Sequence, residues 1–354
     1  GCGCAVDRDR EQVRAGGVHA RDDGSDPRRS SDLEDGRGVK AVSIMKFGIS
    51  KLVMGFDGFL EIEEVEYTLA KTARQNLLEI LFLEEKFDLV TENFYEYETE
   101  LLSIASRMMI FSNDDHVSMS RERNLISRRI VNLLTAGRMY TNQCIQHMER
   151  MYGADSDNLT TLKNHISFQY DNSLGYRVIE ALRNHVQHRG FPIHSMKFSH
   201  KWVDIDTDSQ LLHRAIPEIG IQELAEDGDF KKSVLNELKE IQHNDWVDAR
   251  PLIREYTECI CKIHEKIREA VRPDLMEWER DLDIIIAKFQ NEFGKEVPLA
   301  GLIIVSAKND DQWIETKTIH KGAVERRQAL EQKNSRFVNL HKRVASNEIR
   351  KDDA

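Results

Sequence analysis

The spacing of hydrophobic residues predicts a chain built mainly from long amphipathic helices. Apolar side chains recur every three or four positions over most of the sequence, which places them on one face of a helix. Turn and capping residues, such as the run at 112–115, separate the segments. The predicted helices cover residues 63–84, 87–111, 118–153, 157–170, 173–189, 231–243, 248–271, 274–293 and 322–340.

Strands are predicted where apolar and polar residues alternate or where a short apolar run stands alone. Residues 46–54 form one candidate strand. Residues 194–205 and 211–221 form a two-stranded excursion. Residues 299–305 pair with residues 313–319 across a turn. The expected fold class is therefore mainly α, with a helical bundle followed by a mixed helical region that carries a few short strands.

This pattern divides the chain into four regions. Residues 1–44 are rich in Gly, Asp, Arg and Ser and lack apolar periodicity, so we expect a disordered leader that is not native folded sequence. Residues 45–191 form the helical bundle, and residues 192–340 form a mixed α/β accessory region. Residues 341–354 are a polar tail.

Composition narrows the class of protein. A hydrophobic content of 40% and a charged content of 31% are typical of a globular chain, and the formal net charge is −11. No apolar run reaches the roughly 18 to 20 residues that a membrane-spanning helix needs. The five cysteines form no C-x-x-C pair, so we expect a cytoplasmic protein without a disulfide framework or structural zinc.

The most informative stretch is the predicted helix over residues 173–189. Gly190 and Pro192 follow it and favour a helix end at that point. Its apolar residues step by four and mark a buried stripe, namely Leu174, Val178, Leu182 and Val186. Its last two turns carry a polar cluster, namely Arg183, Asn184, His185, Gln187, His188 and Arg189. A guanidinium and an imidazole placed together in this way can carry out acid–base chemistry on an anionic substrate.

The order Arg183, Asn184, three further residues and then His188 resembles the motif of HEPN domains (higher eukaryotes and prokaryotes nucleotide-binding). The resemblance covers roughly residues 63–191. It implies a helical bundle, a homodimer and a metal-independent endoribonuclease that acts on RNA. It also implies a role as a toxin or anti-phage effector, with an antitoxin or regulatory protein as partner.

The chemistry assigns each residue of the motif a role. His188 is the candidate acid–base group that takes the proton of the ribose 2′-hydroxyl or gives one to the leaving oxygen. Arg183 would stabilise the charge on the phosphorane, and Asn184 would orient it. His185 is an auxiliary RNA-binding residue. The helix over residues 118–153 adds cationic candidates for RNA binding, namely Arg128, Arg129 and Arg138.

Other functions fit the sequence less well or remain open. Five positions on a helix separate side chains by about 140°, so Arg183 and His188 need a loosened helix end, a long reach or a second copy to meet. His185 and His188 could share a metal ion with His194 or His200, but the set lacks a recognised ligand spacing. We therefore expect neither a metal nor a cofactor. The alternative function is a non-catalytic helical module that binds a protein or a nucleotide.

Overall fold

The structure is a computed structural model that describes residues 45–111, 115–205, 208–226, 228–308 and 313–335, together with residues 337, 339–343 and 345. These residues belong to one compact unit that spans residues 44–354. The predicted leader over residues 1–44 and most of the predicted tail over residues 341–354 lie outside the described residues.

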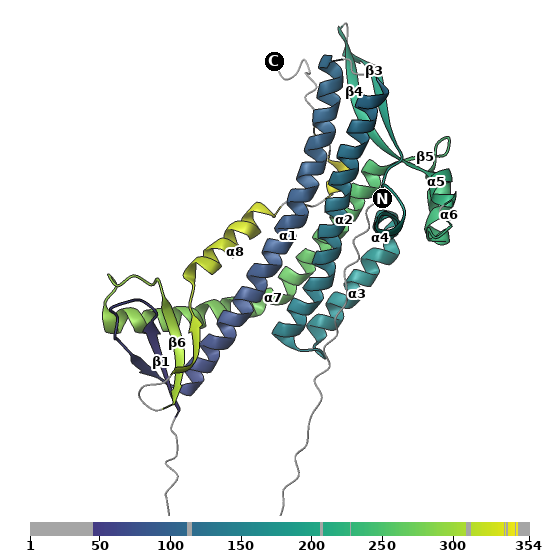
Figure 1. Cartoon of the computed structure of the whole chain (residues 1–354). Coiled ribbons are helices and arrows are strands. Elements are labelled where there is room, and N and C mark those ends of the chain that lie inside the picture. Colours follow the sequence, from purple (N-terminus) through teal and green to yellow (C-terminus); the bar gives the residue numbers. More distant parts are fainter. Residues whose placement is uncertain are drawn as a thin grey trace, which may run out of the picture. The chain divides into compact units, whose positions relative to one another are not determined.

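The described residues confirm a mainly α fold with a few short antiparallel strands (Figure 1). The prediction of two helices between residues 63 and 111 is wrong, because α1 runs without interruption. The α-helices are α1 (Glu64–Phe111), α2 (His116–Tyr152), α3 (Asp157–Asn172), α4 (Leu174–His188), α5 (Ile221–Glu226), α6 (Lys232–Ile241), α7 (Ala249–Phe293) and α8 (Lys321–Lys333). A single 3-10 turn, η1 (Leu340–Lys342), follows.

The prediction of separate helices over residues 248–271 and 274–293 is also wrong, because α7 continues through Pro273. Proline has no amide hydrogen and its ring crowds the preceding turn, so it bends a helix that continues past it. The ribbon of α7 changes direction along its length (Figure 1). The two predicted helices are therefore the two halves of one bent helix.

Both long helices pass through two hydrophobic cores. The first core joins the later part of α1, from Ile80, to the first part of α7, up to Val271, and it also contains α2, α3 and α4. The second core joins the start of α1 to the end of α7, from Leu282. Pro273 lies between the parts of α7 that enter the two cores. Residues from 45–191 and from 192–340 thus share each core.

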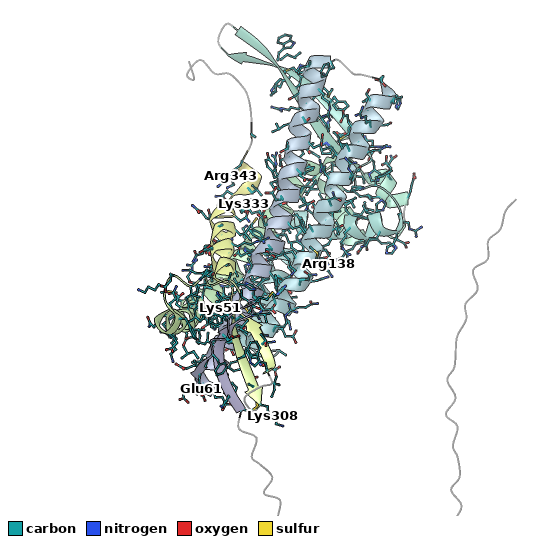
Figure 2. All side chains as sticks on the ribbon, turned by 60° about the vertical axis from the view of Figure 1, so that its left-hand side comes forward. Lys51, Glu61, Arg138, Lys308, Lys333 and Arg343 are labelled. Atoms are coloured by element: carbon teal, nitrogen blue, oxygen red, sulfur yellow. The ribbon has the colours of Figure 1, made fainter. Side chains whose placement is uncertain are left out.

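A four-stranded antiparallel sheet covers the second core. Its strand order is β2 (Leu60–Ile62), β1 (Met45–Lys51), β6 (Leu302–Lys308) and β7 (Trp313–Thr318). The predicted pairing of β6 with β7 is confirmed, but their turn lies outside the described residues. Lys51, Glu61 and Lys308 mark this sheet in Figure 2. The sheet joins the start of the described chain to its last third.

A second sheet extends from the first core. The predicted two-stranded excursion is confirmed as β3 (Ser195–Ile205) and β4 (Asp208–Gly220), and a short third strand, β5 (Trp246–Asp248), pairs with β4. The base of this hairpin is anchored by buried side chains such as Met196 and Ala215. Helices α5 and α6 follow β4 and reach the side of α4, where the candidate site lies.

Candidate functional site

Helix α4 is fixed at its start and along one face. The Ser173 hydroxyl caps it by accepting a hydrogen bond of 3.0 Å from the Tyr176 amide. Gly175 permits a close approach to α7, since a Cβ at this position would lie 2.5 Å from the Leu252 carbonyl oxygen. Of the apolar stripe predicted from the sequence, Val178 and Leu182 are buried, whereas Leu174 and Val186 are half-buried. Only the polar face of the last two turns is left to form a site.

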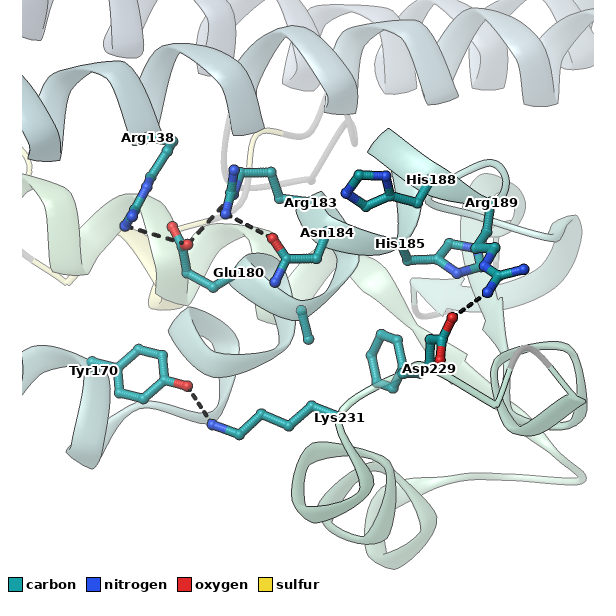
Figure 3. A pocket seen from close by; sticks show the side chains of 12 residues that line it. Arg138, Tyr170, Glu180, Arg183, Asn184, His185, His188, Arg189, Asp229 and Lys231 are labelled. Atoms are coloured by element: carbon teal, nitrogen blue, oxygen red, sulfur yellow. Dashed lines mark hydrogen bonds and ion pairs between the residues drawn. The ribbon is translucent and has the colours of Figure 1, made fainter.

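That polar face forms one wall of a pocket of about 730 Å³. Figure 3 shows its lining side chains. Four of the predicted site residues in α4 line it together, namely Arg183, Asn184, His185 and His188. The other walls come from α2, α3 and the segment before α6, namely Arg138, Tyr170, Asp229, Phe230 and Lys231. The remaining lining residues are Glu180, Ala181 and Arg189 of α4 and its C-cap.

Glu180 is shared by two guanidinium groups in this pocket. Its Oε2 lies 3.5 Å from Arg183 Nε and 3.6 Å from Arg138 Nη1. Arg183 Nη2 also donates a hydrogen bond of 2.7 Å to Asn184 Oδ1. These contacts hold the Arg183 side chain along α4 and bring Arg138 of α2 to the same carboxylate (Figure 3). The sequence analysis missed Glu180, although it stands one helical turn before Arg183.

His188 occupies the last position of α4 and is exposed. The guanidinium of Arg183 points toward Glu180, on the side away from the His188 ring (Figure 3). This is the divergence expected for two positions five residues apart on a regular helix. Within one chain, therefore, the pair lines one pocket but is not directed at a single point.

His185 lies deeper than its neighbours. Its side chain is buried, and its ring centroid is 6.0 Å from that of His194, at the start of the β3–β4 sheet. Burial lowers the pKa of His194, and His194 Nδ1 accepts a hydrogen bond of 3.0 Å from the Gly220 amide. An imidazole that accepts at Nδ1 from a backbone amide is held neutral. The contact between the His185 and His194 rings connects the end of α4 to the neighbouring sheet.

The far side of the pocket comes from the segment that precedes α6. Arg189 forms an ion pair with Asp229. Lys231 Nζ donates a hydrogen bond of 2.7 Å to the Tyr170 hydroxyl of α3. The sequence analysis did not select these partners, because each joins segments that lie about 40 or more residues apart in the chain. Together they close the pocket across from α4.

The three arginines predicted on α2 do not act together. Arg138 lines the pocket, whereas Arg129 forms ion pairs with Glu96 and, at 3.7 Å, with Glu100 of α1. Arg128 is exposed and lies ten residues before Arg138, about 15 Å along the helix axis. Neither Arg128 nor Arg129 is among the pocket residues.

The pocket is locally cationic. The described residues that line it include four permanent cations, namely Arg138, Arg183, Arg189 and Lys231, and two carboxylates, Glu180 and Asp229. The chain as a whole carries a formal net charge of −11. A local excess of positive charge in a concave site attracts anions, even on an acidic protein.

None of the described helices has the length and apolar character needed to cross a membrane. Among the described residues, no three His, Cys, Asp or Glu side chains gather closely enough to hold a metal ion. Comparison with protein-family models, curated proteins and solved structures finds no match.

Proposed function

We propose that the pocket at the end of α4 binds the ribose–phosphate backbone of RNA and cleaves it without a metal ion. The observation that carries this proposal is that Arg183, Asn184 and His188 line one pocket together with Arg138, and that this pocket has an excess of positive charge. The resemblance of Arg183 to His188 to the HEPN motif supports the same reaction.

The proposed reaction uses the 2′-hydroxyl of RNA as its nucleophile. His188, which is exposed at the pocket rim, takes the 2′-hydroxyl proton while the oxygen attacks the adjacent phosphorus. The P–O bond to the 5′-oxygen breaks, and that oxygen receives the proton that His188 has taken up. Arg183 and Arg138 stabilise the additional negative charge on the phosphorane oxygens. The products are a 2′,3′-cyclic phosphate and a 5′-hydroxyl.

The divergence of Arg183 from His188 favours a site completed by a second copy of the chain. In this arrangement the His188 of one protomer approaches the phosphate that Arg183 of the other protomer holds. The Arg183 guanidinium must also exchange Glu180 for the substrate phosphate, since Glu180 now lies 3.5 Å away. We therefore propose a homodimer as the active form.

The test is RNA cleavage in EDTA by the full chain and three variants. His188→Ala should reduce the rate by roughly 10²- to 10⁴-fold, the usual contribution of an acid–base group. Arg183→Ala should reduce it by roughly 10²- to 10³-fold. Arg280→Ala is the matched control, because Arg280 is an exposed arginine of α7 outside the pocket. It should cleave at the parental rate.

Product analysis separates this reaction from a contaminating nuclease. Fragments should end in a 2′,3′-cyclic phosphate, and a substrate with 2′-deoxy sugars should remain intact. Equal cleavage by the parent and the His188→Ala variant would contradict the assignment of His188. Absence of cleavage by the parent under all conditions would contradict the proposal that this chain is a nuclease.

A non-catalytic nucleotide-binding module is the second candidate function. It is favoured by the direction of Arg183, which points away from His188, and by the two aromatic residues Tyr170 and Phe230 in the pocket lining (Figure 3). A volume of about 730 Å³ is within the range of ligand sites. In this case Arg183→Ala would weaken nucleotide binding, measured by calorimetry, while no RNA would be cut.

The resemblance also supports a toxin or anti-phage role, with an antitoxin or regulatory protein as partner. Expression of an active ribonuclease without its partner should arrest the growth of a host cell. Expression of the His188→Ala variant to the same level should not. Growth arrest by both the parent protein and the His188→Ala variant would show that the effect has a cause other than the α4 pocket.

A further inference from the structure

Two histidines face each other across the β3–β4 hairpin, outside the α4 pocket. His200 and His213 are directly opposite in the strand register. Their Nδ1 atoms are 2.9 Å apart, and their rings meet edge to face with centroids 4.6 Å apart. Neither residue lines the pocket in which the proposed nuclease reaction takes place.

The pair lies where the hairpin leaves the first core. Side chains two positions apart in a strand share a face, so His200 lies between Phe198 and Trp202 on one side of the hairpin. Phe198 packs against the core, whereas Trp202 is 64% exposed. The paired strands thus fix the positions of the two histidines, and solvent reaches their imidazole rings from the side of Trp202.

The distance between the two Nδ1 atoms can be compared with the distance between two imidazole nitrogens that bind the same metal ion. Imidazole nitrogens bind divalent transition metals at about 2.0 to 2.1 Å. Two such bonds place the nitrogens about 2.9 Å apart when they meet at 90° and about 3.4 Å apart at the tetrahedral angle. The observed 2.9 Å is that of a hydrogen bond between the rings, and it equals the nitrogen separation of the right-angled arrangement, which a rotation of the two rings toward a common ion would produce.

We propose that His200 and His213 form a two-imidazole site for Cu(II) or Ni(II). These ions favour nitrogen ligands at right angles, whereas Zn(II) favours tetrahedral sites. Each Nδ1 supplies one lone pair, and the proton that now lies between the rings moves through water to Nε2 of the same ring, which stays neutral. No third His, Cys, Asp or Glu side chain of the described residues completes the site, so water or a second copy of the hairpin fills the other positions.

The experiment uses the full chain with Cys2 and Cys4 replaced by Ser, because thiols also bind and reduce copper and the three described cysteines are buried. Cu(II) and Ni(II) are titrated by calorimetry, and tryptophan fluorescence is recorded. Trp202 reports directly, since it lies two residues from His200 on the same face. His200→Ala and His213→Ala are compared with His116→Ala, which removes an exposed histidine from α2.

Both single variants should lose one metal equivalent and the associated quenching. Residues that only orient a metal ligand through a hydrogen bond contribute about 10- to 100-fold to metal affinity. Loss of a ligand itself should therefore weaken metal binding by at least about tenfold. His116→Ala should match the parent, and Zn(II) should bind more weakly than Ni(II). The proposal is overturned if both variants retain the parental equivalents, or if parent and variants alike show no quenching that saturates with metal. Circular dichroism of each variant confirms that the hairpin face, not the fold, has changed.

Discussion

Glu180 controls how much positive charge the α4 pocket offers to a ligand. Its carboxylate lies 3.5 Å from Arg183 and 3.6 Å from Arg138. Both guanidinium groups are therefore partly neutralised before any anion binds. A phosphate that enters the pocket must compete with this carboxylate for the two guanidinium groups, so Glu180 weakens phosphate binding.

Glu180→Gln should strengthen phosphate binding. Each of the two partly exposed ion pairs contributes about 0.5 kcal/mol, so their loss should tighten the binding of a 2′-O-methyl RNA oligonucleotide by about fivefold. Fluorescence anisotropy at one fixed salt concentration measures this affinity. Glu277→Gln is the matched control, because it removes one negative charge from an exposed pair with Arg280. Equal tightening by both variants would assign the effect to net charge and contradict the competition.

Acid should destabilise the fold through buried groups. Burial alone would raise the pKa of Glu84, but the hydrogen bonds from Arg268 and the adjacent His264 ring outweigh it and lower this pKa to about 2. Burial lowers the pKa of His264. Both groups bind protons more weakly in the folded chain than in the unfolded chain. Their stabilisation is complete above the unfolded pKa values of 6.5 and 4.5 and is lost as the pH falls.

The expected result is a free energy of unfolding that decreases from pH 7 toward pH 5 and decreases further below pH 4.5. The Glu84 shift alone corresponds to a loss on the order of 3 kcal/mol between about pH 4.5 and pH 2. Urea unfolding at a series of pH values measures this. In the Glu84→Gln variant the decrease below pH 4.5 should be smaller. A stability that stays constant from pH 7 to pH 3 would contradict the linkage.

At the residue scale, the sequence could predict four members of the α4 wall, but neither Glu180 nor the partners from other elements. The spacing of Arg183, Asn184 and His188 is visible in the sequence, because all three belong to one helix. Asp229 and Lys231 reach the pocket only because α6 folds back beside α4. No local pattern encodes such a contact.

At the scale of elements, the strongest polar link joins α1 to α7. Arg268 donates two hydrogen bonds to the Glu84 carboxylate, at 2.8 and 2.6 Å, and a third to the Asn334 carbonyl, at 3.0 Å. Glu84 and His264 are buried, and Phe87 stacks on the His264 ring at 3.9 Å. These hydrogen bonds thus connect α1, α7 and the segment after α8 to one another.

Arg268→Ala should be strongly destabilising, because it leaves the Glu84 charge buried without its partner. The expected loss is about 3 to 5 kcal/mol, measured by urea unfolding. Arg280→Ala, which removes an exposed arginine of the same helix, should cost less than about 0.5 kcal/mol. The double variant Glu84→Gln, Arg268→Met should lose less stability than Arg268→Ala alone. A double variant that is the least stable of the three would contradict this explanation.

The same link explains why the sequence predicted α1 as two helices. The run Glu84, Glu85 and Lys86 interrupts the apolar pattern and is typical of a helix boundary. In the structure Glu84 is buried, because Arg268 neutralises it. Pro273 misled the prediction for α7 in a similar way. In both cases a tertiary contact or a tolerated bend overrides a local signal.

At the scale of the whole molecule, the two predicted regions depend on each other. The first part of α7 contributes fully buried residues to the core around α1, α2 and α4, among them Ile253, Tyr256, Ile260 and Ile263. Tyr256 also contacts Tyr176 of α4, with ring centroids 5.3 Å apart. The helices that present the candidate site therefore need the second half of the chain.

A fragment of residues 45–191 should not fold by itself. Without α7 it would expose the apolar faces of α1, α2 and α4, which leads to aggregation or to a loosely packed helical state. Circular dichroism during heating should show a broad, gradual loss of helix, and a hydrophobic dye should bind. The full chain should unfold in one cooperative transition. A fragment that unfolds cooperatively would instead support an independent domain that ends at residue 191.

The sequence could predict three of the four strands of the first sheet but neither β2 nor the strand order. The apolar pattern identified β1, β6 and β7 as candidates, and the short turn suggested that β6 pairs with β7. The pairing of β1 with β6 joins opposite ends of the described chain, and no feature of either segment specifies the other. Such long-range pairing follows from the fold of the intervening helices.

This pairing also sets an order of events during translation. Strand β1 leaves the ribosome before its partner β6 has been made, because a long segment of chain separates them. At about 5 to 20 residues per second, the roughly 250 residues between Ile49 and Ile304 take about 12 to 50 s to add. During that time the β1 edge is open to other nascent chains. A chaperone that shields this strand until β6 emerges would raise the yield of native protein.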